Sequence, residues 1–86
     1  MKHSRAMAIA TLFLTGAAWA GPSCHEPETR WMSEPDFKAK IQQQGYQIKT
    51  FKISKGKCYE IYGFDQSGKK VEIYFNPVSG AELERK

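Results

Sequence analysis

The sequence has few of the side chains that carry most enzymatic and metal chemistry. It contains only two cysteines, Cys24 and Cys58, and a single histidine, His25, follows residue 20. General acid-base catalysis needs a positioned titratable group, and structural zinc sites use paired ligands at short spacings. His25 precedes Pro27 in a segment without hydrophobic periodicity, so little holds it in place. We therefore expect no enzyme, no catalytic residue, no bound metal and no cofactor.

Long hydrophobic runs are absent after residue 20, where no segment approaches the ~20 apolar residues that a transmembrane helix needs. A shorter apolar run, from Ala6 to Ala18, lies before residue 20. It follows Lys2 and Arg5 and leads into the small-residue ending Ala18-Trp19-Ala20. This order is typical of a secretory signal peptide. We expect residues 1–20 to be a signal peptide, cleaved near Ala20, and residues 21–86 to be a periplasmic or secreted protein without a membrane span.

The charge excess is also small. The net charge of +4 includes Lys2 and Arg5, which would leave with the signal peptide. The remaining lysines are scattered among acidic residues, which is typical of a solvated surface. A nucleic-acid groove needs denser basic clustering, so no nucleic acid is expected as a partner.

The two cysteines are predicted to pair. In an oxidising compartment, a lone pair most simply forms a disulfide, here between Cys24 and Cys58. A domain this small buries little surface, and closing such a loop would stabilise it by roughly 4 kcal/mol. Two other uses stay open: a zinc site that adds His25 and a carboxylate, and a redox-active thiol pair.

Local signals divide the exported part into an arm and a domain. Residues 21–32 contain prolines and scattered charge without a period, which predicts an extended arm. Ser33 is placed to cap a helix whose first turn contains Pro35, and Gly45 is placed to end it. The domain is therefore expected to occupy residues 33–86.

After Gly45 the hydrophobic period changes to two. Strands are predicted over about 46–54, 58–64 and 70–76, with a bulge near Lys49 or Thr50 and a short fourth strand over 81–83. Short glycine-containing connections indicate antiparallel hairpins. The predicted fold class is α+β: one N-terminal helix packed on a three- to four-stranded antiparallel sheet, with a disulfide-tethered arm.

Several segments resemble the PepSY domain family of bacterial envelope proteins. They are Gly45-Tyr46, Cys58–Tyr62, Asp65–Pro77 and Ser79-Gly80. The resemblance covers roughly residues 33–83, although Asn76 stands where the family usually has an aspartate. It implies a helix-and-sheet module that inhibits or regulates peptidases, or that senses or binds within the envelope, and it supplies no catalytic residues.

The predicted function is a non-enzymatic binding or regulatory module that modulates a peptidase or another envelope protein. Tyr62, Phe64 and Tyr74 share one face of the sheet and, with Trp31, are the candidate partner-binding residues. Either a folded-back arm with Trp31 covers this face, or its rings dock a partner. A free sheet edge offers strand addition as a second docking mode. The chain is expected to be a monomer or weak homodimer.

The alternative function is an accessory or sensor subunit of an envelope redox or metal-handling system. Its candidate ligands are His25, Glu26 and Glu28.

Overall fold

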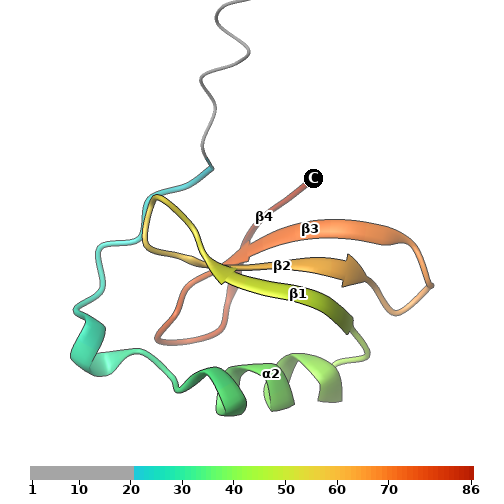
Figure 1. Cartoon of the computed structure of the whole chain (residues 1–86), viewed down its shortest axis with the longest axis horizontal. Coiled ribbons are helices and arrows are strands. Elements are labelled where there is room, and N and C mark those ends of the chain that lie inside the picture. Colours follow the sequence, from blue (N-terminus) through green and yellow to red (C-terminus); the bar gives the residue numbers. More distant parts are fainter. Residues whose placement is uncertain (1–20) are drawn as a thin grey trace, which may run out of the picture.

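A computed structural model describes residues 21–86, so the predicted signal peptide lies outside the described residues (Figure 1). A short 3₁₀ turn and one helix precede four strands. In chain order the elements are η1 (Glu28–Arg30), α2 (Glu34–Gln43), β1 (Gln47–Ile53), β2 (Tyr59–Phe64), β3 (Lys70–Phe75) and β4 (Glu82–Arg85). The turn η1 interrupts the arm, which was predicted to be extended throughout; the Arg30 amide donates to the Pro27 carbonyl at 2.9 Å.

Helix α2 begins and ends as the sequence predicts. The Ser33 hydroxyl accepts a hydrogen bond from the Asp36 amide at 3.2 Å, which satisfies one of the free donors of the first turn. Gly45 follows the helix with φ of 102°, a conformation that costs glycine little. Phe37 and Ile41, one turn apart, are both fully buried against the sheet.

The four strands form one antiparallel sheet in the order β1-β2-β3-β4. Ile61 at its centre pairs with Phe51 on β1 and with Ile73 on β3. The register between β1 and β2 shifts between Ile48 and Thr50, which confirms the predicted bulge. The fourth strand spans Glu82–Arg85, slightly later than the predicted 81–83.

The main core lies between α2 and one face of the sheet. Its ring pairs include Phe37 with Tyr59, whose centroids are 4.9 Å apart, and Phe37 with Phe75 at 5.1 Å, both edge-to-face. Large rings bury much area per residue, which suits a domain of this size. The buried members are Phe37, Ile41, Tyr46, Tyr59, Ile61, Val71, Ile73 and Phe75.

The arm is held to the sheet by the predicted disulfide. Cys24 and Cys58 are bonded, with their Cα atoms 5.2 Å apart and 34 positions apart in the sequence. The Cys24 amide also donates to the Gly56 carbonyl at 2.8 Å, in the turn between β1 and β2. The predicted fold class, including the tethered arm, is therefore confirmed.

Candidate functional site

The sheet has one face covered by α2 and one face that no helix covers among residues 21–86 (Figure 1). Alternate residues of a strand point to opposite faces, so the strand residues between the core positions share this second face. We call it the open face. Its residues on the two central strands are Glu60, Tyr62, Phe64, Lys70, Glu72 and Tyr74.

One end of the open face lies beneath the arm. Tyr74 packs with Cys24 and Cys58 in a second, smaller cluster and is only 4% exposed. Gly21 lies directly against its ring, because a Cβ atom there would come within 2.6 Å of the Tyr74 Cζ. Tyr74, predicted as a docking ring, is thus covered by the arm and is not presented on the free part of the face.

The other predicted docking rings divide between two sites. Tyr62 is 37% exposed and Phe64 is half-buried, and both lie on the uncovered part of the open face. Trp31 instead packs edge-to-face against Tyr59, with centroids 5.6 Å apart, on the helix side of the sheet. The prediction that Trp31 helps to cover the open-face rings was wrong, because the arm passes to the helix side before it reaches this residue.

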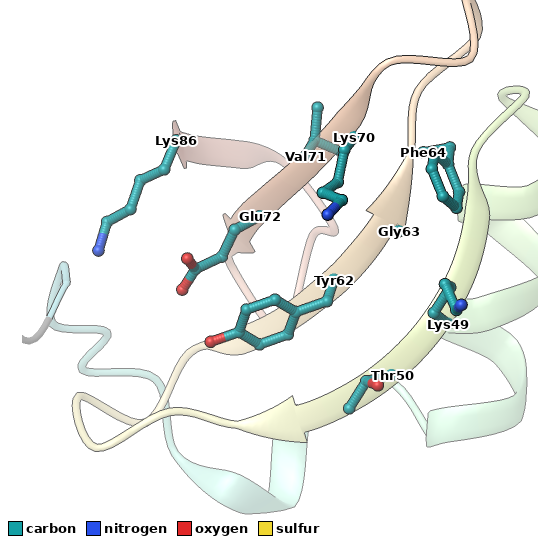
Figure 2. Close-up of a pocket in the computed structure, with 9 residues that line it drawn as sticks. All are labelled: Lys49, Thr50, Tyr62, Gly63, Phe64, Lys70, Val71, Glu72 and Lys86. Carbon is teal, nitrogen blue, oxygen red and sulfur yellow. The ribbon is translucent and has the colours of Figure 1, made fainter.

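The uncovered part of the open face is hollowed. A shallow depression of about 580 Å³ lies on it, with polar and aromatic side chains around it (Figure 2). Its lining comprises Lys49 and Thr50 from β1, Tyr62, Gly63 and Phe64 from β2, Lys70, Val71 and Glu72 from β3, and Lys86 beside β4.

Two carboxyl groups meet beside this depression. Glu60, on β2, is a buried acid, only 3% exposed. Burial raises its pKa, and its hydrogen bond with Glu72 on β3 raises the pKa further. The same hydrogen bond lowers the pKa of Glu72, so the pair favours a protonated Glu60 that donates to an ionised Glu72.

Two tyrosines complete this group of acids. The Tyr74 hydroxyl donates to Oε2 of Glu72 at 3.2 Å. Hydrogen bonding with Glu72 also raises the pKa of Tyr62 to about 12, so its hydroxyl stays a donor at neutral pH. Sequence reasoning placed these side chains on one face but missed the carboxyl pair. The alternation of side chains along each strand places Glu60 and Glu72 on the same face. Their contact can be predicted only when the register across the β2–β3 turn is also known.

Comparison with known proteins then identifies the family. The family described as "Peptidase propeptide and YPEB domain" (PepSY_2) matches residues 4–86. The chain belongs to this family. No curated protein and no solved structure matched it. The resemblance to PepSY domains inferred from the sequence is therefore confirmed, and PepSY domains are generally non-catalytic modules of the propeptide or inhibitor kind.

The family's usual aspartate position has a structural use in this PepSY domain. Oδ1 of Asn76 accepts hydrogen bonds from the amides of Val78 at 2.8 Å and Ser79 at 3.1 Å, which closes the turn after β3. Its Nδ2 donates to Oε2 of Glu26 in the arm at 3.0 Å. An aspartate would keep the turn but place a carboxylate against Glu26, so Asn76 suits a chain whose arm folds back here.

The ligands proposed for the alternative, metal-handling function are dispersed or already engaged. His25 is exposed on the arm, Glu26 accepts from Asn76, and Glu28 lies 3.9 Å from the Lys57 ammonium. Within residues 21–86, no group of three or more histidine, cysteine, aspartate or glutamate side chains is placed to hold a metal ion.

Proposed function

We propose that this PepSY domain is a non-enzymatic periplasmic binding or regulatory module. It modulates a peptidase or another envelope protein through the open face of its sheet or through a sheet edge. Family membership supports the class of function, because propeptide-like modules act by binding. The observation that carries the choice of surface is the incomplete cover of the open face: the arm protects Tyr74 and leaves Tyr62 and Phe64 beside a depression.

The sheet edge is the second docking mode. β1 and β4 each pair with one neighbour within residues 21–86, so the outer side of each strand is free to accept an extended segment. The domain acts as a monomer or weak homodimer in this proposal. Either mode leaves the core between α2 and the sheet undisturbed.

An extracytoplasmic location fits the chemistry of the chain. The Cys24–Cys58 disulfide is of the kind that persists in oxidising compartments. Among the described residues, no helix is long and apolar enough to cross a membrane. We further propose that the N-terminal 20 residues direct export and are cleaved near Ala20.

The proposal is tested by capture and by inhibition. Immobilised protein is incubated with a bacterial envelope extract, and the bound proteins are identified and assayed for peptidase activity with and without the free domain. We expect a specific partner whose capture falls at least tenfold with Tyr62→Ala, because an aromatic anchor of an interface carries a large share of its affinity. The matched control is Leu83→Ala, which truncates a similarly exposed apolar side chain on β4.

Failure to capture any specific partner would contradict the proposal, and two other results would decide between its docking modes. Equal capture by the parent, Tyr62→Ala and Leu83→Ala proteins would remove the open face as the working surface. Loss of capture with Leu83→Ala alone would move the contact to the β4 edge.

A further inference from the structure

The uncovered part of the open face carries positive charge that the rest of the domain does not neutralise. Lys49, Lys70 and Lys86 line the depression from three different strands or their ends (Figure 2). The Lys86 ammonium lies over the Tyr74 ring, 5.5 Å from its centroid. All three are exposed. The four salt bridges within residues 21–86 use other cations, namely Lys38, Lys57 and Arg85.

The acidic side chain in the lining, Glu72, partly offsets Lys86 but forms no salt bridge with Lys49 or Lys70. Glu72 accepts a hydrogen bond from the Glu60 carboxyl and another from the Tyr74 hydroxyl, and these bonds together with the charge of Lys86 lower its pKa. Other carboxylates form salt bridges outside the depression: Glu34 with Lys38, and Asp65 and Glu82 with Arg85. Lys49 and Lys70 therefore form no salt bridge at the depression, and the salt bridges within residues 21–86 are made by cations outside its lining.

Aromatic surface lies among these cations. Tyr62 and Phe64 contribute rings to the lining, and Thr50 adds a hydroxyl group from β1. Lysine side chains are flexible, so their ammonium groups can pair with carboxylates whose positions vary. The face of an aromatic ring can pack against an apolar side chain. The combination is complementary to a segment in which acidic and apolar residues alternate.

We propose that the depression binds an extended acidic segment of the partner protein, with aspartate or glutamate carboxylates at Lys49 and Lys70 and an apolar side chain on Tyr62 and Phe64. This inference rests on the proposed function, because it specifies the chemistry of the partner. Charge complementarity supports this proposal, because the site is cationic and the proposed ligand is anionic. The aromatic rings between the lysines favour a peptide with apolar side chains over a small inorganic anion.

The first experiment uses three labelled peptides and the protein purified from the periplasm of an expression host. One peptide alternates glutamate with leucine, the second replaces every glutamate by glutamine, and the third replaces it by lysine. Exposed ion pairs each contribute roughly a two- to fivefold change in affinity, so we expect the glutamate peptide to bind about tenfold more tightly than the glutamine peptide. Added salt should remove most of this difference.

Matched variants locate the site. We expect Lys49→Gln/Lys70→Gln to weaken binding of the glutamate peptide about tenfold, by loss of two ion pairs. The control Lys40→Gln/Lys69→Gln removes the same charge from positions outside the lining and should change affinity less than twofold. Amide shifts of Thr50, Tyr62 and Phe64 in the parent protein should follow the same titration.

Several outcomes would overturn the inference. Equal binding of the glutamate and glutamine peptides, equal effects of the two double variants, or no binding at all would each do so. Binding to vesicles containing phosphatidylglycerol without binding to the peptide would identify a membrane surface as the occupant. If Tyr62→Ala abolishes capture of the envelope partner while the lysine variants do not, the proposed function stands and only the acidic character of the segment fails.

Discussion

At the residue scale, Glu60 is the one buried acid among residues 21–86. Its cross-strand neighbours are Lys52 on β1 and Tyr74 on β3, and Glu84 on β4 lies opposite Tyr74. The Glu60 carboxyl is hydrogen-bonded with the side chains of Glu72 and Tyr62. Because burial is the largest cause of its raised pKa, Lys52 does not compensate for the loss of hydration. Ionising Glu60 therefore costs more in the folded state than in the unfolded state.

This environment predicts a stability that falls as the pH rises. The folded protein binds the Glu60 proton more tightly than the unfolded chain does, so the free energy of unfolding decreases as the pH rises from the ordinary glutamate pKa of about 4.5 to the raised folded pKa. Glu60→Gln should remove this decrease, because a neutral amide can donate to Glu72 as the protonated acid does. Urea unfolding at pH 5 and pH 7.5 measures the difference.

The control for this prediction is Glu84→Gln, which neutralises an acid in the same cross-strand row. Its unfolding should keep the pH dependence of the parent protein. Glu72 has the opposite sign: its pKa is lowered, so its contribution is lost only below about pH 4.5, outside this window. A Glu60→Gln protein that declines between pH 5 and 7.5 as steeply as the parent would contradict the assignment.

At the scale of elements, the contact between β1 and β2 depends on a single glycine. Gly63 pairs with Ile48 at the bulge, and a Cβ atom at this position would lie 1.9 Å from the Gln47 carbonyl oxygen. The neighbouring atom is backbone, so it cannot rotate away as a side chain can. The bulge, which turns Lys49 toward the depression, requires this close approach of the strands.

Gly63→Ala is therefore expected to destabilise the domain by about 1–3 kcal/mol, the usual cost of overpacking. The comparison variant is Gly68→Ala in the β2–β3 turn, where φ is 82° and nothing lies within 4 Å of the new Cβ. That change adds backbone strain of about 1 kcal/mol but no collision. Chemical denaturation of both proteins should rank Gly63→Ala as the more damaging, and the reverse order would show that the strands separate easily.

At the scale of the whole molecule, the arm and the disulfide decide which part of the open face is available. The arm packs on the β1–β2 turn, where a Cβ atom on Gly56 would lie 2.2 Å from the Pro22 carbonyl oxygen. The same segment covers Tyr74. The covalent bond between Cys24 and Cys58 keeps it there and so separates a protected half of the face from a free half.

Replacing both cysteines by serine should lower the free energy of unfolding by about 4 kcal/mol, from the added entropy of an unfolded chain without this loop. Amide exchange at Tyr74 should increase, since the arm would leave the face. Urea unfolding and hydrogen exchange measure the two effects. The control is alkylation of the parent without reductant, which should modify no cysteine; equal stability of the parent and double variant would refute the role given to the bond.

Features set by neighbours in the chain were predictable from the sequence. Ser33 and Gly45 bound α2 because caps act over one turn, and the parity change between Ile48 and Phe51 revealed the bulge because strand side chains alternate. The disulfide followed from the presence of two cysteines. The helix-and-sheet fold and the PepSY resemblance followed from the order of these local signals.

Only the tertiary structure decided what lies together on the open face. The carboxyl pair of Glu60 and Glu72 depends on the register across the β2–β3 turn, and the path of the arm placed Trp31 on the helix side and Tyr74 under Gly21. The three lysines meet at the depression because the sheet brings β1, β3 and β4 together. Periodicity determines which face a residue occupies, but contacts between distant segments depend on register and chain path, which local patterns do not encode.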